Sequence, residues 1–550
     1  MIIGAALWLR GHDLGRRPMH ADEANQAVKT GELLEKGTYA FDPRDHHGPT
    51  LYYAAAALAR IRGEHNLAQL SETTVRLVPA IAGTLAVLLT ALLGASLPAA
   101  DPVRTLRWPA LAAAAFVAVS PPALYYSRYF IQETILAALT LAVFVAARAW
   151  WRTGLARWAL AAGLAAGLMQ ATKASAPLFL LFAFIAARLA GLRPVSRRPA
   201  RDVAFAAVAA LFAATLLYTS FGANPSGLRD ALAAYGHAAE RFLGPSAGPT
   251  GHEKPWTYYA MLFGWKREGG LVWHQAAFSA LAVAGFIVAW TRRDVVPRAV
   301  ALYALLVGAA FSSFPYKTPW HAVHLVAPLA LLAGVALTAI ARLRTGRPVA
   351  AAFGLIVLAT LFQQAWRASF LRPADARNPW AYVHSAPDVL KVRALAEAAR
   401  AAVETGEGNV MRRGIGAVVG YAGEKPLEAD WRVVKLGDGR FMGTGPFYGG
   451  ARFQIGPMAL VTDEASGASA VLACRRIQAA DQEMFRHVGV EPSKVPILGL
   501  KSTVHFRADF QPIAETILVV QSPGAHITDP VEMPYKHLRK GIKLRPMGPV

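Results

Sequence analysis

Residues 73–97 read TTVRLVPAIAGTLAVLLTALLGASL, and this apolar run decides the class of fold. A helix needs about 20 predominantly apolar residues to cross the roughly 30 Å hydrocarbon core of a bilayer. The run therefore predicts a transmembrane helix. Runs of similar character follow it along the chain, at 107–125, 131–150, 156–171, 174–190, 203–221, 272–291, 298–314, 320–341 and 349–366.

The composition agrees with a membrane protein. Hydrophobic residues make up 54% of the 550-residue chain, and its mean hydropathy is +0.32. A soluble core can hide one or two runs of this length, but not about ten. We predict a multi-pass α-helical membrane protein with about 10–11 transmembrane helices. Residues 2–9 are too short to span a bilayer, so either the first helix continues irregularly past Arg10 or a first spanning helix is truncated, and we favour truncation.

Arginine is distributed unevenly between alternate gaps of this pattern. One set of gaps is rich in arginine: Arg104 and Arg107; Arg148, Arg152 and Arg157; Arg188, Arg193, Arg197, Arg198 and Arg201; Arg292, Arg293 and Arg298; Arg342, Arg344 and Arg347. Because positively charged loops stay on the cytoplasmic side, we assign these gaps to the cytoplasm. The other gaps then lie outside, including the long loops 10–71 and 222–271 and everything after Trp366.

The net charge of +22 follows from this topology. Its excess lies largely in short gaps between apolar runs, so it does not indicate a nucleic-acid partner. We expect the protein to lie in the cytoplasmic membrane and to contact membrane lipid. The only cysteine, Cys474, excludes a disulfide within the chain.

The first outer loop carries two helical patterns. Asp22–Lys36 predicts a helix that Asp22 caps and Gly37 ends. Thr50–Ile61 is apolar and aromatic, and predicts a segment that lies in the membrane interface.

Beyond about Pro379 the apolar periodicity stops. Residues 388–404 predict an amphipathic helix, and short strands are predicted at 415–419, 458–462, 504–506 and 517–520. We therefore divide the chain into a transmembrane domain, 1–370, and an extracytoplasmic α/β domain, 380–550.

The sequence His20-Ala21-Asp22-Glu23 is the most prominent polar motif of the predicted outer face. Asp22 can be a helix cap and Glu23 a first-turn charge that the helix dipole favours. The two carboxylates can equally be a general base and a metal ligand beside a membrane-embedded substrate. The pair alone does not decide between these interpretations.

Arg128 and Glu133 lie at the next outer gap. Glu133 can simply begin the helix that follows it. Arg128 suits a phosphate, because its guanidinium group forms bidentate hydrogen bonds with anionic oxygens.

Two further outer gaps contain lysine. Lys173 can extend to the membrane interface or hold a phosphate through its point charge. Lys317 and His321 lie in Phe314–His321, where an aromatic belt accounts for Tyr316 and Trp320 but not for the lysine and histidine. Each signal is weak alone, but together they form a cluster on one face.

In order and spacing, these residues resemble the multi-pass GT-C glycosyltransferases. The resemblance is to the dolichyl-phosphate-mannose mannosyltransferase and aminoarabinose-transferase-like group, over about 10–370. The matching positions are Asp22-Glu23, the segment Gly48-Pro49-Thr50-Leu51-Tyr52-Tyr53, Arg128 with Glu133 where the family more often has Asp, Thr172-Lys173-Ala174 with Ala for Gly, and Lys317 to His321 with His for Tyr. The run Tyr-Lys-Thr-Pro-Trp at 316–320 resembles a motif of the flippase-activity-associated subgroup of these enzymes.

The resemblance implies an inverting transfer of a sugar from a polyprenyl-phosphate carrier to an extracytoplasmic acceptor, which can be a lipid, a glycan or a protein. It implies Asp22 as the general base, with Glu23 supporting it or binding a divalent cation such as Mg or Mn. Glu133 joins this catalytic set. The implied substrate-binding residues are Arg128, Lys173, Lys317, His47, Tyr52 and His321.

Two other functions are compatible with a multi-pass membrane protein. A non-catalytic flippase or flippase-accessory protein would bind the lipid-linked sugar without transferring it. It would need charged groups on a continuous path deep within the helices, whereas the charges seen here are mainly at helix ends. A structural assembly protein would leave the acidic pair unexplained.

Overall fold

The structure is a computed structural model that describes residues 1–43, 47–97, 108–243, 253–268, 270–375, 377–382, 389–415, 427–475, 477–500 and 505–518. The chain divides into two compact units, Met1–Ser385 (unit 1) and Ala386–Val550 (unit 2). Each unit is described by itself.

Unit 1 is almost entirely helical. Its elements are α1 (Ile2–Gly11), α2 (Ala21–Lys36), α3 (Thr50–Ile61), α4 (Glu72–Gly94), α5 (Trp108–Val119), α6 (Pro121–Tyr126), α7 (Glu133–Thr153), α8 (Ala156–Gln170), α9 (Ala176–Ala190), α10 (Pro199–Tyr218), α11 (Gly227–Leu243), α12 (Tyr258–Phe263), β1 (Trp265–Glu268), β2 (Leu271–His274), α13 (Ala276–Thr291), α14 (Val295–Ser313), η1 (Pro319–Ala322), α15 (Val323–Ala341), α16 (Gly346–Trp366) and the π-helical turn η2 (Arg367–Leu371).

Every predicted apolar run overlaps a helix, and the run 107–125 covers two, α5 and α6. In the described part of the chain, 6 helices are long and apolar enough to cross a membrane, and shorter apolar helices accompany them. Large apolar side chains on these helices are exposed, such as Val208, Leu211 and Phe212 on α10 at 67%, 65% and 62%. An exposed stripe of this kind is unfavourable in water and natural against lipid tails. Unit 1 is a multi-pass helical membrane domain.

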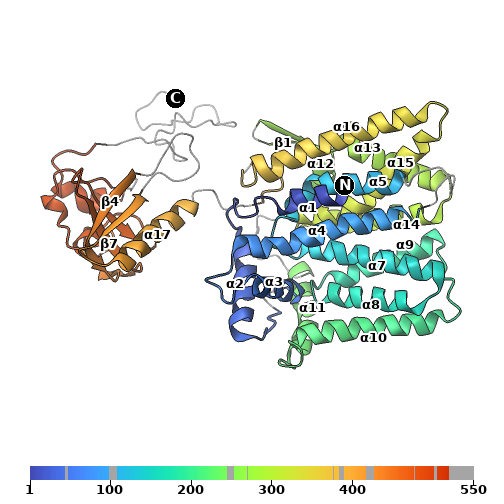
Figure 1. Cartoon of the computed structure of the whole chain (residues 1–550), viewed down its shortest axis with the longest axis horizontal. Helices are drawn as coiled ribbons and strands as arrows, with labels where there is room; N and C mark the ends of the chain where they lie inside the picture. The colour runs from blue at the N-terminus through green and yellow to red at the C-terminus, as the bar shows by residue number, and fades with distance from the viewer. Residues whose placement is uncertain are drawn as a thin grey trace. The chain divides into compact units, whose positions relative to one another are not determined.

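Small residues allow the helices of unit 1 to approach closely. In Figure 1, α4, α7, α8 and α10 lie side by side, and α8 packs against both α7 and α10. Gly163 and Gly167 of α8 face α10, where a Cβ would lie 2.1 Å from the Ala206 carbonyl oxygen and 2.3 Å from that of Ala210. This is the small-residue spacing by which helices associate in membranes.

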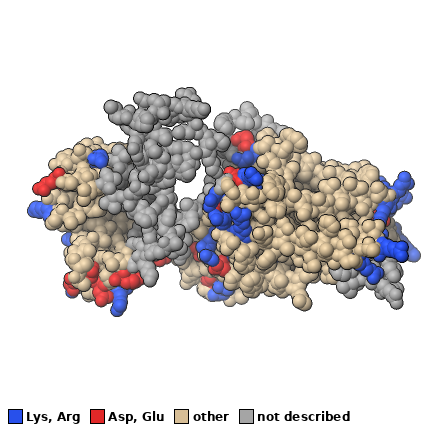
Figure 2. All heavy atoms as spheres, turned by 90° about the horizontal axis from the view of Figure 1, so that it is seen from above, with Lys and Arg blue, Asp and Glu red and all other residues tan. Residues whose placement is uncertain are grey.

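The charges of unit 1 gather at its two ends. Figure 2 shows Lys and Arg at both ends of the unit and a broad band almost free of charge between them. Helices α2, α3 and α11 lie together at one end (Figure 1). Arg104 and Arg107, which belong to the arginine-rich gaps, lie outside the described residues.

The N-terminus of α2 corrects one prediction. His20, not Asp22, is the N-cap: its Nδ1 accepts a hydrogen bond from the backbone N–H of Asp22, and the Glu23 carboxylate accepts one from the backbone N–H of His20. This reciprocal arrangement is a capping box in which histidine replaces the usual hydroxyl. Gly37 ends the helix as predicted, in the left-handed conformation with φ 71°.

Unit 2 contains an antiparallel sheet in the order β3-β4-β7-β8 and a separate pair β5–β6. The strands are β3 (Val410–Ile415), β4 (Leu427–Gly437), β5 (Arg440–Met442), β6 (Arg452–Gln454), β7 (Met458–Asp463) and β8 (Ser469–Ala473). Helix α17 (Val389–Thr405) packs on the sheet through Ala398, Ala399 and Ala402, which share a core with Trp431 and Val461.

Short elements complete unit 2: α18 (Glu483–Arg486), η3 (Pro492–Lys494), α19 (Arg507–Phe510) and η4 (Gln511–Ile513). The strand predicted at 504–506 is wrong for its described part, because residues 505–506 form a turn that leads into α19. Residues 517–518 are not in a strand, and the rest of that prediction lies outside the described residues, as do 416–419.

Candidate functional site

The Glu23 carboxylate is the centre of a buried cluster that joins three parts of unit 1. Its Oε1 accepts hydrogen bonds from Arg17 Nη2 at 2.8 Å, Arg76 Nε at 2.9 Å and the backbone N–H of Phe130 at 2.9 Å. Its Oε2 accepts from Arg76 Nη2 at 3.0 Å and from the His20 backbone N–H at 3.0 Å. Glu23 thus ties the start of α2 to α4 and to the segment between α6 and α7. We call this group the Glu23 cluster.

The electrostatics of the Glu23 cluster favour the charged carboxylate. Burial alone raises the pKa of Glu23, but Arg17 and Arg76 outweigh it and hold the pKa at about 2. Arg76 is itself 0% exposed, and its Nη1 donates to the carbonyl oxygens of Leu14 and Arg17. Because a buried charge is tolerated only when it is paired and hydrogen-bonded, these residues stabilise one another.

Asp22, one residue before Glu23, is in a different environment. Its side chain is 48% exposed and its Oδ2 lies 3.6 Å from His20 Nδ1. That nitrogen already accepts the Asp22 backbone N–H, and burial lowers the pKa of His20, which keeps the imidazole neutral. Among the described residues no Lys or Arg forms an ion pair with Asp22. Its carboxylate is therefore accessible and is not neutralised by a Lys or Arg of the described residues.

The cluster bears on the predicted metal site. Both Glu23 oxygens are occupied by N–H donors, and three of these five donors belong to the cationic side chains of Arg17 and Arg76, so Glu23 does not fit a divalent cation. In the described residues no group of three or more His, Cys, Asp or Glu side chains could hold a metal ion. Of the two carboxylates in the pair, only that of Asp22 is accessible, and metal binding by Asp22 stays a prediction.

Arg128 and Tyr52 are used in packing. Arg128 Nη1 donates to the carbonyl oxygen of Leu9 at 3.0 Å, its Nη2 donates to that of Asp13 at 3.1 Å, and its guanidinium lies over the Phe370 ring. Tyr52 is 0% exposed and its hydroxyl donates to the Gln26 side chain. We therefore place both residues in the framework of the site, and not among the groups that face a substrate.

Lys173 and Glu133 do come together. They form an ion pair in which the lysine side chain is 15% exposed and the glutamate 3%. The segment after His47 is held beside this pair, because the Gly48 N–H donates to the Thr172 carbonyl and the Thr50 N–H to that of Ala171. A Cβ on Gly48 would lie 2.2 Å from the Ala171 oxygen, which explains the glycine.

His321 belongs to the same neighbourhood. It lies within electrostatic range of both Lys173 and His47. Its Nδ1 is 3.2 Å from the Thr318 hydroxyl and 3.3 Å from the hydroxyl of Tyr259, which donates to the Thr318 carbonyl. The imidazole is therefore fixed in orientation by α12 and η1.

Lys317 is a buried cation that has no acidic partner in the described part of the chain. Its side chain is 2% exposed, and its Nζ donates to the carbonyl oxygens of Lys254 and Phe314. Among the described residues it forms no ion pair. Burial lowers the pKa of Lys317, because the ammonium group loses hydration that two carbonyls replace only in part. Such a cation suits an anionic ligand.

Tyr382 lies near two parts of the site, the one that contains Asp22 and the one that contains Lys317. Burial raises the pKa of its hydroxyl, and Tyr316, Glu253 and Asp22 all act in the same direction. Tyr382 therefore lies within electrostatic range both of Asp22 and of the segment that carries Lys317. Sequence reasoning missed Tyr382 and Arg76. Arg76 carried a usable signal, because a charge inside an apolar run is costly unless it has a partner.

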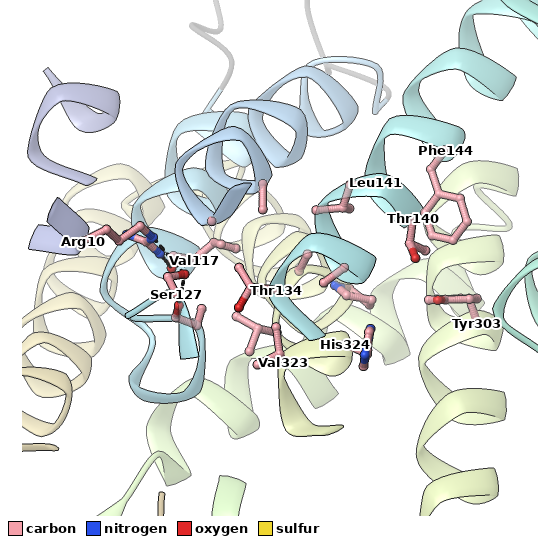
Figure 3. Close-up of a pocket in the computed structure, with 17 residues that line it drawn as sticks. Arg10, Val117, Ser127, Thr134, Thr140, Leu141, Phe144, Tyr303, Val323 and His324 are labelled. Atoms are coloured by element: carbon pink, nitrogen blue, oxygen red, sulfur yellow. Dashed lines mark hydrogen bonds between the residues drawn. The ribbon is translucent and has the colours of Figure 1, made fainter. Parts of the chain in front are cut away.

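A separate cavity lies inside the helical bundle. Its volume is about 30 Å³, and polar groups at Arg10, Ser127, Thr134, Tyr303 and His324 line it together with apolar side chains. Figure 3 shows Arg10 and Ser127 at one end and Tyr303 with His324 at the other. A buried water needs about 10–15 Å³ of such space, so the cavity has room for a water or two and is too small for a sugar.

Comparisons with known proteins give a fold for unit 1. The crystal structure of ArnT from Cupriavidus metallidurans in the apo state shares 14% identity, covers 76% of this chain and 82% of that chain, and has a TM-score of 0.50. The same protein bound to undecaprenyl phosphate gives 15% identity, the same coverage and a TM-score of 0.51. Unit 1 has the GT-C glycosyltransferase fold. This confirms the fold that the sequence resemblance implies.

Other comparisons are less extensive. The Archaeoglobus fulgidus oligosaccharyltransferase, in complex with Zn and sulfate, shares 16% identity, covers 72% of this chain and 55% of that chain, and has a TM-score of 0.48. A family model described as the MlrC C-terminus matches residues 389–537, within unit 2. No curated protein matches the chain.

Proposed function

We propose that this protein transfers a sugar from a polyprenyl-phosphate carrier to an acceptor on the outer face of the cytoplasmic membrane. One observation carries the proposal: the GT-C unit holds an accessible carboxylate, Asp22, directly beside a carboxylate fixed by two arginines. ArnT, which shares this fold, has been crystallised with undecaprenyl phosphate, and this supports a lipid phosphate as part of the donor.

Asp22 acts as the general base in this proposal. It takes the proton from the acceptor hydroxyl or amine as the acceptor atom attacks the anomeric carbon of the donor. The bond from that carbon to the phosphate oxygen breaks, and the polyprenyl phosphate leaves with the electron pair. A single displacement of this kind inverts the anomeric configuration, and no protein carboxylate becomes glycosylated.

Lys317 and Lys173 stabilise the departing phosphate. Lys317 has no acidic partner among the described residues, so its charge is available to the negative charge that develops in the transition state. Lys173 is paired with Glu133, which fixes the ammonium group near His321. His47 and His321 supply further polar contacts. In this scheme Glu133 orients Lys173, and it does not act as a second base.

The membrane side follows from charge. The arginine-rich gaps face the cytoplasm under the positive-inside rule, so Asp22, the lysines and unit 2 lie outside. If a divalent cation takes part, its ligands are Asp22 and the donor phosphate, because magnesium sites commonly combine one carboxylate with substrate phosphates.

The test is Asp22→Asn in the full-length protein, reconstituted in vesicles with undecaprenyl-phosphate-linked sugars and a membrane extract as the acceptor source. Release of undecaprenyl phosphate is measured, because this product does not depend on which acceptor is used. Loss of the base is expected to lower turnover by about 10²–10⁴-fold. Glu32→Gln is the matched control, since Glu32 lies on the same helix and is 40% exposed. Unchanged turnover in Asp22→Asn would refute the proposal.

A further inference from the structure

A groove lies at the C-terminal end of α16, apart from the residues assigned to sugar transfer. Its volume is about 630 Å³, and it is lined by Phe362, Gln363, Trp366, Arg367, Leu371 and Arg372. Two guanidinium groups and one amide thus share a groove with two aromatic rings and a leucine.

The π-helical turn brings the two arginines together. Its bond runs from the backbone N–H of Arg372 to the carbonyl of Arg367, five residues earlier, at 2.9 Å. On a regular α-helix, residues five apart point about 140° away from each other, at about 100° per residue. The wider turn allows both side chains to line one groove.

Each of the two guanidinium groups is held by contacts within the protein and keeps further N–H donors that these contacts do not use. Arg367 Nη1 donates to the Val272 carbonyl at 3.0 Å, and its guanidinium lies 4.8 Å from the centre of the Trp273 ring. Arg372 Nη1 donates to Asp375 at 2.6 Å. Each side chain retains N–H donors for which the described residues offer no partner. The anchors fix the direction of the remaining donors, which suits the bidentate recognition of a phosphate group.

The other half of the groove is apolar and continues onto the lipid-facing side of α16. Phe362 and Leu371 are 42% and 67% exposed, and Leu355 and Ile356 further along the helix are 65% and 59% exposed. The Trp366 and Phe370 rings stack at 4.4 Å beside them. Aromatic rings of this kind mark the headgroup level of a membrane. A ligand here meets cations at one end and lipid tails at the other.

We propose that this groove binds the phosphate headgroup of an anionic membrane lipid, whose acyl chains lie along the exposed face of α16. The guanidinium donors bind the phosphate oxygens, and Gln363 can donate to the headgroup. Free phosphate would satisfy the arginines but would leave the apolar half of the groove uncovered. The inference goes beyond the proposed sugar transfer and does not depend on it, because none of the residues that line the groove is assigned to that reaction.

The test titrates phosphatidylglycerol into purified, delipidated full-length protein and follows lipid binding by native mass spectrometry. Arg372→Gln is expected to weaken binding about tenfold, since it removes a charge-assisted contact with the phosphate. Arg377→Gln is the matched control: Arg377 also bonds Asp375, at 2.8 Å, but does not line the groove. Gln363→Glu, at an exposed helix position, introduces a negative charge into the groove and is expected to weaken binding as well.

Two outcomes overturn the proposal. One is equal binding of phosphatidylglycerol by the wild type, Arg372→Gln and Gln363→Glu. The other is that inorganic phosphate displaces bound phosphatidylglycerol as effectively as additional phosphatidylglycerol does. That result would assign the groove to a free anion. The expected result is weak competition by inorganic phosphate and loss of lipid in both groove variants, with Arg377→Gln unchanged.

Discussion

Asp22 and Glu23 are neighbours in the chain, yet they belong to two different regions of the molecule. Glu23 lies in a buried cluster in which two arginines and two backbone N–H groups bond its oxygens. Asp22 lies at a half-exposed face and has no cationic partner among the described residues. The comparison shows that two adjacent carboxylates occupy different environments: Glu23 fixes the start of α2 from inside the fold, and Asp22 is held beside it at an accessible position.

Burial decides this division. Successive residues of a helix point about 100° apart, so one side chain can face the core while the next faces solvent. A carboxylate in the core needs cations to offset its desolvation, and those cations lower its proton affinity. A general base needs the opposite, an accessible carboxylate that is free to accept a proton.

The largest effect is expected from breaking the buried half of this comparison. Glu23→Gln keeps the shape of the side chain but removes the charge that Arg17 and Arg76 share. Two buried guanidinium groups then lack their counter-ion, which costs about 3–5 kcal/mol of unfolding free energy. Chemical unfolding followed by tryptophan fluorescence measures the loss. Glu32→Gln, on the exposed side of the same helix, should leave the unfolding free energy unchanged; equal stability of the two variants would contradict the buried cluster.

The next effect concerns the buried cation Lys317. Lys317→Gln removes a buried charge that has no acidic partner in the described residues, and should lower the rate of undecaprenyl phosphate release by about 100-fold, as loss of one stabilising donor does in other enzymes. Lys266→Gln is the control, because Lys266 is already paired with Glu268 at 3.2 Å. A drop of similar size in both variants would mean that Lys317 has no particular role.

A smaller effect tests the loop that holds His47 beside Lys173. A Cβ on Gly48 collides with the Ala171 carbonyl, so Gly48→Ala must displace the loop or the end of α8. Overpacking of this kind costs about 1–3 kcal/mol. Thermal unfolding should reveal it, whereas Gly4→Ala, where a Cβ meets nothing within 4 Å, should not change the midpoint.

The smallest effect is a dependence on acid. The pKa of Glu23 is lowered to about 2, below its ordinary value of 4.5. Its stabilising contribution is therefore complete above about pH 4.5 and is lost as the pH falls toward 2, by about 1–2 kcal/mol between pH 5 and pH 3. Denaturant titrations at these two pH values should show the loss in the wild type and in Asp22→Asn. The same loss in Glu23→Gln would assign the acid sensitivity to another group.

Much of the fold can be predicted from the sequence, because run length and apolar character are local properties. The ten apolar runs, the helix that ends at Gly37 and the acidic pair were all visible in this way. The partners of the charged side chains could not be predicted in this way. Glu23 and Arg76 are 53 positions apart, and Lys173 and Glu133 are 40 apart, so their pairing depends on helix packing. The contacts of Arg128 also depend on packing. From the sequence it resembled a phosphate ligand, but in the structure its Nη1 and Nη2 atoms donate to backbone carbonyls of the N-terminal segment.

The most direct test of the division between Asp22 and Glu23 measures two quantities on the same preparations of Asp22→Asn and Glu23→Gln: the rate of undecaprenyl phosphate release and the free energy of unfolding. Asp22→Asn is predicted to lose turnover by at least about 100-fold at unchanged stability, and Glu23→Gln to lose stability. A stable but inactive Glu23→Gln protein together with an active Asp22→Asn protein would contradict the account.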